Sequence, residues 1–260
     1  MKQYIWQRQT YADLAKKYHL SKRWIQTKLD ENKIKPTITL KPGAELVIAA
    51  DTTFFSRAEG ITVFREPNLK KIVWWQRTIN EKAEVYCRGR CFLEKNGLKI
   101  KAVVLDGRRG IREVFSGIPV QMCHFHQKRI INRYLTTRPK LPASIELRAI
   151  LKTMSRSNEV ELKDRLNTWF QEWKLFLKQK TTNPLTGHWS FTHKRLRSAY
   201  RSLINNLPYL YTYQKYPELN IPDTTNSLDG YFNGLKSLIN VHRGLSPCRR
   251  YRMVVKILSS

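Results

Sequence analysis

Apolar residues recur every three or four positions between residues 10 and 31, on both sides of a short break at residues 19–22. This spacing predicts two short helices, each with one apolar stripe. Ser21 stands where the second helix would begin and is a favoured N-cap residue. Two such helices are typical of a helix-turn-helix, although an ordinary helical hairpin has the same pattern. The two stripes contain Leu14, Ala15 and Tyr18, and Trp24, Ile25 and Leu29.

The polar side of the second predicted helix is basic. We expect its exposed residues to contact DNA phosphates or base edges, as the second helix of a helix-turn-helix does. Pro36 and Pro42 then break any helix in the following segment. Residues 1–40 are therefore interpreted as a helix-turn-helix DNA-binding region and linker. The candidate DNA-binding residues are Lys22, Arg23, Gln26 and Lys28.

From residue 45 the pattern becomes that of a sheet. Residues 45–55 are a continuous apolar run of the kind found in a central strand, and two further β-rich runs follow. A helix is expected at residues 80–95, then two more strand-and-helix pairs. Over residues 41–140 the predicted order is three strands, helix, strand, helix, strand, helix. This order predicts an α/β core with five strands.

Residues 141–215 return to helical spacing and are predicted to be an almost entirely helical insertion. Trp189 within it is either a core residue of the insertion or a platform on which an unpaired base stacks. Residues 216–260 are expected to supply the last core helix and a basic C-terminal segment.

The charge of the chain indicates what kind of partner it binds. Its 260 residues include 48 Lys and Arg against 20 Asp and Glu, a formal net charge of +28 that is spread along the whole length. DNA is the expected partner, because clustered cations gain affinity by releasing phosphate counterions. The 41% apolar content excludes a disordered basic tail.

The sequence also indicates where in the cell the protein is located. No apolar run approaches the ~20 residues of a membrane span, and the N-terminus lacks the apolar core of a signal peptide. We expect a cytoplasmic protein associated with DNA and not with a membrane. The four cysteines do not form a disulfide framework in a chain of this length, so they are expected to be reduced thiols.

Two aspartates follow predicted buried strands. Asp51 ends the first strand and Asp106 the fourth, and these strands would lie side by side. Their carboxylates would then share a Mg²⁺ or Mn²⁺ ion, since hard cations prefer oxygen ligands. Strand-end aspartates also form turns, and the sequence after Asp106 is a fair turn sequence.

A Cys-His-Phe-His sequence at residues 123–126 lies where the fifth strand passes into a helix. A zinc site is the obvious alternative, but zinc normally needs at least three protein ligands. The nearest other pair, Cys87 and Cys91, is a poor partner. A structural role at the strand–helix junction is favoured.

A third carboxylate, Asp229, stands early in a predicted amphipathic helix. With Asn226 as N-cap, Asp229 is at the third helical position, where a carboxylate stabilises free backbone N–H groups. The same side chain is also the candidate third member of a catalytic set. The apolar face of this helix would consist of Leu228, Phe232, Leu235 and Ile239.

The strand-end Asp51, the "LDG" at Asp106, the Cys-x-x-His of Cys123 and His126, and "TTNSLD" at residues 224–229 together resemble the Mutator-like bacterial insertion-sequence transposases. The resemblance covers roughly residues 45–250. It implies a ribonuclease H-like core, a five-stranded mixed sheet with flanking helices, that carries an all-α insertion. It also implies that Asp51, Asp106 and Asp229 bind the catalytic metals, and that Cys123, His126 and Asn226 are structural. The family's third acid is usually glutamate, and this chain has the shorter Asp229.

The resemblance further implies a function. The expected activity is cleavage of transposon ends and their transfer to target DNA, with two Mg²⁺ or Mn²⁺ ions that activate water and stabilise the leaving 3′ oxygen. Because two ends must be brought together, we expect a dimer or larger homo-oligomer. The alternatives are a helix-turn-helix regulator or domesticated transposase without activity, and another nuclease or resolvase of the same fold class.

Overall fold

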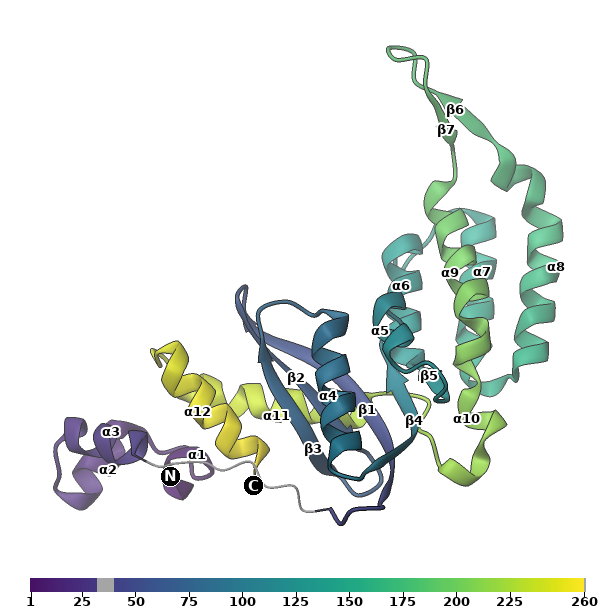
Figure 1. Cartoon of the computed structure of the whole chain (residues 1–260). Coiled ribbons are helices and arrows are strands. Elements are labelled where there is room, and N and C mark those ends of the chain that lie inside the picture. The colour runs from purple at the N-terminus through teal and green to yellow at the C-terminus, as the bar shows by residue number, and fades with distance from the viewer. Residues whose placement is uncertain (32–39, 260) are drawn as a thin grey trace. The chain divides into compact units, whose positions relative to one another are not determined.

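In the computed structural model of the chain, the structure describes residues 1–31 and 40–259. They form two compact units: unit 1 is Met1–Lys99 with Asn226–Ser260, and unit 2 is Ile100–Thr225 (Figure 1). Most of the predicted linker, at residues 32–39, lies outside the described residues. No described helix is long and apolar enough to cross a membrane.

Unit 1 holds the N-terminal helices, an antiparallel three-stranded part of the sheet and the C-terminal helices. Its elements are α1 (Lys2–Ile5), α2 (Tyr11–Tyr18), α3 (Lys22–Asp30), β1 (Glu45–Ser56), β2 (Glu59–Glu66), β3 (Lys71–Thr78), α4 (Ala83–Lys95), α11 (Asn226–Val241) and α12 (Pro247–Leu258). β1 pairs with β2 and β2 with β3, both antiparallel. The long apolar run that predicted the first strand is therefore β1, although it begins an antiparallel meander.

The core of unit 1 lies between this sheet and α11. The predicted apolar face of α11 is buried as expected, because its four residues recur at positions that lie on one side of a helix. They join residues of β1, β2, α12 and the N-terminal helices in one cluster. α11 therefore covers the face of the sheet on which Ala49 and Val63 lie.

Unit 2 begins with a parallel strand pair and continues as a helical bundle. Its elements are β4 (Lys99–Leu105, which starts at the unit boundary), α5 (Arg109–Val114), β5 (Val120–Met122), α6 (His124–Leu135), α7 (Pro142–Thr153), η1 (Met154–Arg156), α8 (Glu159–Lys178), β6 (Lys180–Thr182), β7 (Trp189–Phe191), α9 (Lys194–Leu210), α10 (Thr212–Lys215) and η2 (Pro217–Leu219). β4 and β5 are parallel. α6 to α9 enclose a separate apolar core.

The strands form one five-stranded sheet in the order β3-β2-β1-β4-β5. Antiparallel pairs on one side and a parallel pair on the other make it mixed. The prediction of an α/β fold with a five-stranded mixed sheet and flanking helices is confirmed, including the order of strands and helices up to α6.

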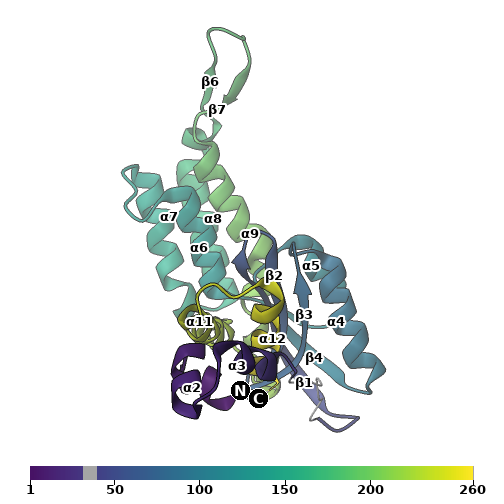
Figure 2. The same cartoon turned by 90° about the vertical axis from the view of Figure 1, so that its left-hand side faces the viewer.

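The prediction of an all-α insertion needs one correction. α8 ends at Lys178, and the chain then forms the β6–β7 hairpin before α9 begins. The hairpin residues are largely β-branched or aromatic, which favours strands, and Gly187 in the turn has a φ of +67° that suits glycine. In both views the hairpin extends beyond the ends of α8 and α9 (Figure 1, Figure 2).

Candidate functional site

The prediction that Asp51 ends the first strand is wrong: the strand continues to Ser56, so Asp51 lies near the middle of β1, on the face that α11 covers. It stands directly opposite Val63 of β2, and directly opposite residues in an antiparallel pair share one face of the sheet. Val63 is fully buried against α11, whereas Asp51 is half-buried. The Thr52 backbone N–H donates to Asp51 Oδ1 at 2.8 Å. The carboxylate is thus held locally on a rigid strand.

A buried polar network lies on the opposite face of the same strand. Thr52 Oγ1 is 2.7 Å from Thr62 Oγ1 and 3.3 Å from the Tyr86 hydroxyl, which donates to Glu81 Oε1 at 2.7 Å. Burial, with the nearby negative charges of Glu81 and Asp51, raises the pKa of Tyr86 well above its ordinary value. The network therefore stays protonated at Tyr86 and fixes the part of β1 that carries Asp51.

Asp229 lies in the first turn of α11, beside the buried Leu228. Asn226, the expected N-cap, is the first residue of this helix. Arg65 of β2 anchors the same turn: its Nη1 donates to the Ser227 carbonyl, and its guanidinium lies 5.5 Å from the centroid of the Tyr231 ring. Arg65 itself is only 9% exposed, while Ser227 is exposed. The sequence alone does not single out Arg65, which stands between Phe64 and Glu66 at the end of β2.

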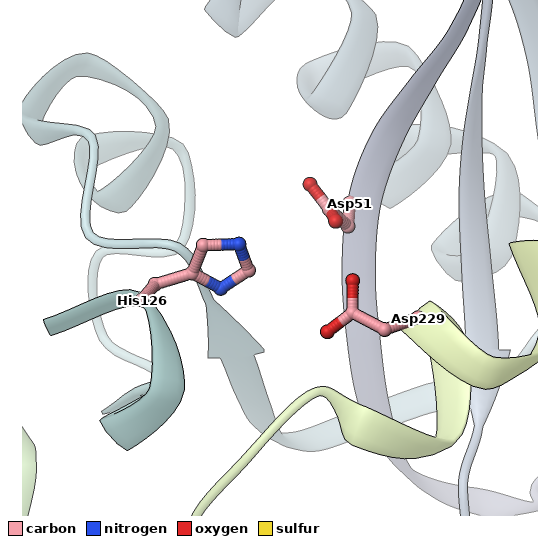
Figure 3. A group of neighbouring side chains, drawn as sticks. All are labelled: Asp51, His126 and Asp229. Atoms are coloured by element: carbon pink, nitrogen blue, oxygen red, sulfur yellow. The ribbon is translucent and has the colours of Figure 1, made fainter. Parts of the chain in front are cut away.

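The carboxylates of Asp51 and Asp229 come together within unit 1. Oxygens of the two groups lie within 4.8 Å of each other, one on β1 and one on α11, 178 positions apart in the sequence (Figure 3). His126, also drawn there, belongs to unit 2 and is described below.

The pair fits a divalent cation. Mg²⁺ binds carboxylate oxygens at about 2.0–2.1 Å, so two ligands on opposite sides of one ion are about 4 Å apart. The observed spacing is close to this, and the donors are hard oxygens of the type that Mg²⁺ and Mn²⁺ prefer. Asp51 and Asp229 are the residues that would hold such an ion.

Asp106 follows β4 in unit 2, where it shapes a turn. Its Oδ1 accepts a hydrogen bond from the Arg108 N–H at 3.1 Å, and its Oδ2 is 3.6 Å from Arg108 Nε. Gly107 has a φ of +92°, and a Cβ there would lie 2.4 Å from Met122 Cε, so only glycine fits. The turn contacts that sequence reasoning gave as the alternative role of Asp106 are therefore present.

The Cys-x-x-His residues form a buried cluster in unit 2. Cys123 precedes α6, and both the N–H and the hydroxyl of Thr225 donate to its Sγ at 3.3 Å. Thr225 Oγ1 is also 3.5 Å from His126 Nδ1. Burial raises the pKa of the Cys123 thiol, but hydrogen bonds with His126 and Thr225 outweigh it and bring the pKa below its usual value. The cluster ties α6 to the end of unit 2. Thr225 belongs to the TTNSLD sequence noted above, but the sequence assigned it no role.

His124 makes separate contacts. Its Nε2 is 2.7 Å from the Leu210 carbonyl, and its Nδ1 is 3.5 Å from Asp223 Oδ2. The hydrogen bond with His124 lowers the pKa of Asp223. All four cysteines are free thiols, as predicted. Among residues 1–31 and 40–259, no cysteine belongs to a group of three or more side chains placed to hold a metal.

The predicted helix-turn-helix pattern corresponds to α2 and α3. Ser21 Oγ accepts from the Trp24 N–H at 3.1 Å, so the predicted N-cap is confirmed. Lys22, Arg23 and Lys28 are exposed, and Gln26 is half-buried.

The expected stripe on α3 is wrong at one position. Trp24 is 46% exposed, while Ile25 alone on this helix is fully buried. A tryptophan tolerates this because its ring also contacts a cation, here Lys28 Nζ at 5.7 Å from the ring centroid.

Comparison with known proteins adds no family to these observations: no family model matches the chain, and no curated protein matches it significantly.

Proposed function

We propose that this protein is a DNA transposase that cleaves transposon ends and joins them to target DNA by metal-dependent phosphoryl transfer on a ribonuclease H-like core. The observation that carries the proposal is the convergence of Asp51 and Asp229 in unit 1. A chain with a net charge of +28 has few carboxylates, and two of them meet on one face of a rigid sheet. A DNA-binding protein has no physical need for such a pair, whereas phosphoryl transfer does.

Asp51, Asp229 and, as the third member, Asp106 would hold the ions in this proposal. Mg²⁺ or Mn²⁺ would supply the chemistry, by lowering the pKa of a bound water and by stabilising charge on the leaving 3′ oxygen. The protein itself fixes the carboxylates. Thr52 holds Asp51 through its N–H, and Arg65 anchors the turn that carries Asp229.

DNA binding would be divided between α3 and the basic surface. Lys22, Arg23, Gln26 and Lys28 would contact the transposon ends, and other cations would hold phosphates without regard to sequence. The exposure of three of these four side chains supports this assignment. The same helices would also serve a regulator without activity, so catalysis decides between the two functions.

The test is cleavage and strand transfer on duplexes that carry the ends of the parent element, with Mg²⁺, Mn²⁺ or a chelator. We expect metal-dependent nicking by the wild type. Loss on the order of 10³-fold is expected in Asp51→Asn, Asp106→Asn and Asp229→Asn, since ~4 kcal/mol of barrier corresponds to about this factor. Asp164→Asn, which removes an exposed carboxylate of α8, is the matched control and should cleave normally. Equal cleavage by all the variants would exclude the triad.

A further inference from the structure

A cavity of about 630 Å³ lies at one end of the helical bundle of unit 2. It is formed where the end of α6 and the α6–α7 loop meet the start of α9. Its volume is within the range of sites that bind part of a ligand or a segment of a chain. None of the residues described above as candidate catalytic or DNA-binding groups lines it.

The lining of this cavity is strongly basic and contains no Asp or Glu among its described residues. Four of its cations are exposed, and three of them, Arg138, Lys140 and Lys194, form no ion pair with any described residue. Burial lowers the pKa of the fifth group, His193. The five basic residues are Arg138, Lys140, His193, Lys194 and Arg195.

This charge is local and does not simply reflect the composition of the chain. A second cavity of the same unit, between α7 and α8, is lined by Glu146, Asp164 and Glu172 with a single arginine. The two cavities of this unit therefore differ in charge, one lined by basic residues and the other mainly by acidic ones. Uncompensated cations in a concave site raise the local concentration of anions.

The backbone around the basic cavity also favours an anion. The first turn of α9 is not capped, because the side chain of His193 accepts no hydrogen bond from it. That side chain instead contacts Gln179 Oε1 at 2.9 Å and stacks on Phe176. Free N–H groups at a helix start add to the attraction of nearby cations for phosphate.

One wall of the cavity is strained. Thr136 has a φ of +67° and a ψ of 172°, a region that is populated almost only by glycine, and its N–H donates to the Asn132 carbonyl at 2.8 Å. Such outliers cost ~1–3 kcal/mol and are concentrated at ligand-binding loops. The strained residue thus lies at the start of the loop that carries Arg138 and Lys140.

We infer that this cavity binds the phosphodiester backbone of DNA, as a contact separate from α3 and from the carboxylate pair. The inference relies on the proposed function only for the identity of the polyanion. Two further cations, Lys180 of β6 and Arg197 of α9, lie against aromatic rings of the β6–β7 hairpin. Lys180 Nζ lies 3.7 Å from the centroid of the Trp189 ring, and the Arg197 guanidinium lies 3.7 Å from that of Phe191. Trp189 is 55% exposed, so it is not a core residue of the insertion, and Lys180 covers one face of its ring.

The experiment measures binding of the full-length protein to a DNA duplex in EDTA as a function of salt. Arg138→Ala/Lys140→Ala removes two cavity charges. Lys152→Ala/Lys163→Ala removes two exposed charges of α7 and α8 outside the cavity and is the matched control. Each phosphate contact contributes about −0.9 to the slope of log K against log salt, so the cavity variant should lose about 1.8 of slope. Its affinity should fall about tenfold for any sequence, and the control should change by less than about twofold.

A charge-conserving variant, Arg138→Lys/Lys140→Arg, should restore both slope and affinity. Identical slopes for the cavity variant and the control would overturn the inference, and so would failure of the charge-conserving variant to restore binding. The binding assay needs no metal, so it is independent of cleavage. If the cavity variant loses the expected salt dependence but the wild-type protein does not cleave DNA, only the proposed function is refuted.

Discussion

The carboxylate pair of unit 1 and the basic cavity of unit 2 are built in opposite ways. Asp51 and Asp229 are each held by neighbours that fix their position: a backbone N–H in one case and an anchored helix turn in the other. Arg138, Lys140 and Lys194 are exposed and unpaired among the described residues. Chemistry needs groups held in place, whereas binding of a polyanion needs only charge that nothing else neutralises.

The largest expected effect tests the metal half of this comparison. Mn²⁺ at about 100 times its dissociation constant should stabilise the folded protein by about 2.7 kcal/mol, because the ion binds the folded state only. Asp229→Asn should abolish this stabilisation, and a chelator should reverse it in the wild type. The measurement is thermal unfolding with and without Mn²⁺.

The basic cavity supplies the control for that measurement. Arg138→Ala/Lys140→Ala should retain the full Mn²⁺ effect, since it leaves unit 1 unchanged. An Mn²⁺ effect that survives in both Asp51→Asn and Asp229→Asn would mean that the ion binds elsewhere. Asp229→Glu is a separate probe: stronger stabilisation by Mn²⁺ would show that the shorter side chain weakens the site.

The contrast between the two regions also explains what could be predicted from the sequence. Asp51 follows a continuous apolar run, which predicted the strand β1. Asp229 stands beside Leu228 in a stripe of apolar residues at helical spacing, which predicted the helix α11. Arg65 could not be found in this way, because one arginine in β2 carries no periodic signal and its partner Ser227 is 162 positions away. The basic cavity combines residues from two distant loops, and only the packing of α6 against α9 brings them together.

Trp24 shows a limit of the same reasoning. Its spacing marked it as part of a buried stripe, but burial also depends on which surface the helix meets. Likewise, the β6–β7 hairpin lies in a segment too short to show a clear period-two pattern.

The second largest effect concerns the anchor of α11. Arg65→Met keeps most of the side-chain volume but removes the charged donor to the Ser227 carbonyl and the contact with the Tyr231 ring, which costs about 1–3 kcal/mol. We expect faster hydrogen exchange in the first turn of α11 and weaker Mn²⁺ binding. Arg77→Met is the control: Arg77 is more exposed and lies 3.9 Å from Glu59, so it should change stability by less than about 0.5 kcal/mol. Equal effects of the two substitutions would remove Arg65 from any role in placing Asp229.

A third prediction concerns the strained wall of the basic cavity. Thr136→Gly should relieve ~1–3 kcal/mol of backbone strain against an entropic cost of ~0.5–1 kcal/mol, for a net gain of about 1 kcal/mol. The unfolding midpoint should rise by about 2–4 °C. Thr137, at the next position, has no positive φ, so Thr137→Gly relieves no strain and should lower the unfolding midpoint. A lower midpoint for Thr136→Gly would mean that the loop is not strained.

The smallest effect is a pH dependence confined to unit 1. Asp30 of α3 accepts hydrogen bonds from Arg249 at 2.8 Å and pairs with Arg252 at 3.1 Å, both on α12. The hydrogen bond from Arg249 lowers the pKa of Asp30. A carboxyl whose folded pKa lies below its unfolded value of about 3.9 stabilises the folded state fully above that value. Its contribution is lost as the pH falls through the folded pKa.

Asp30→Asn should therefore be less stable than the wild type near pH 7, and the difference should shrink as the pH falls below about 3.9 and vanish below the folded pKa. Because both partners are partly exposed, we expect no more than about 1 kcal/mol, and less at high salt. Urea unfolding across this pH range measures it. Asp13→Asn, at the N-terminal capping box of α2, separates the effects, because Asp13 bonds only within its own helix start and not to α12. A difference that persists unchanged at low pH would mean that Asp30 acts through packing and not through its charge, and that α3 is held to α12 without the ion pairs.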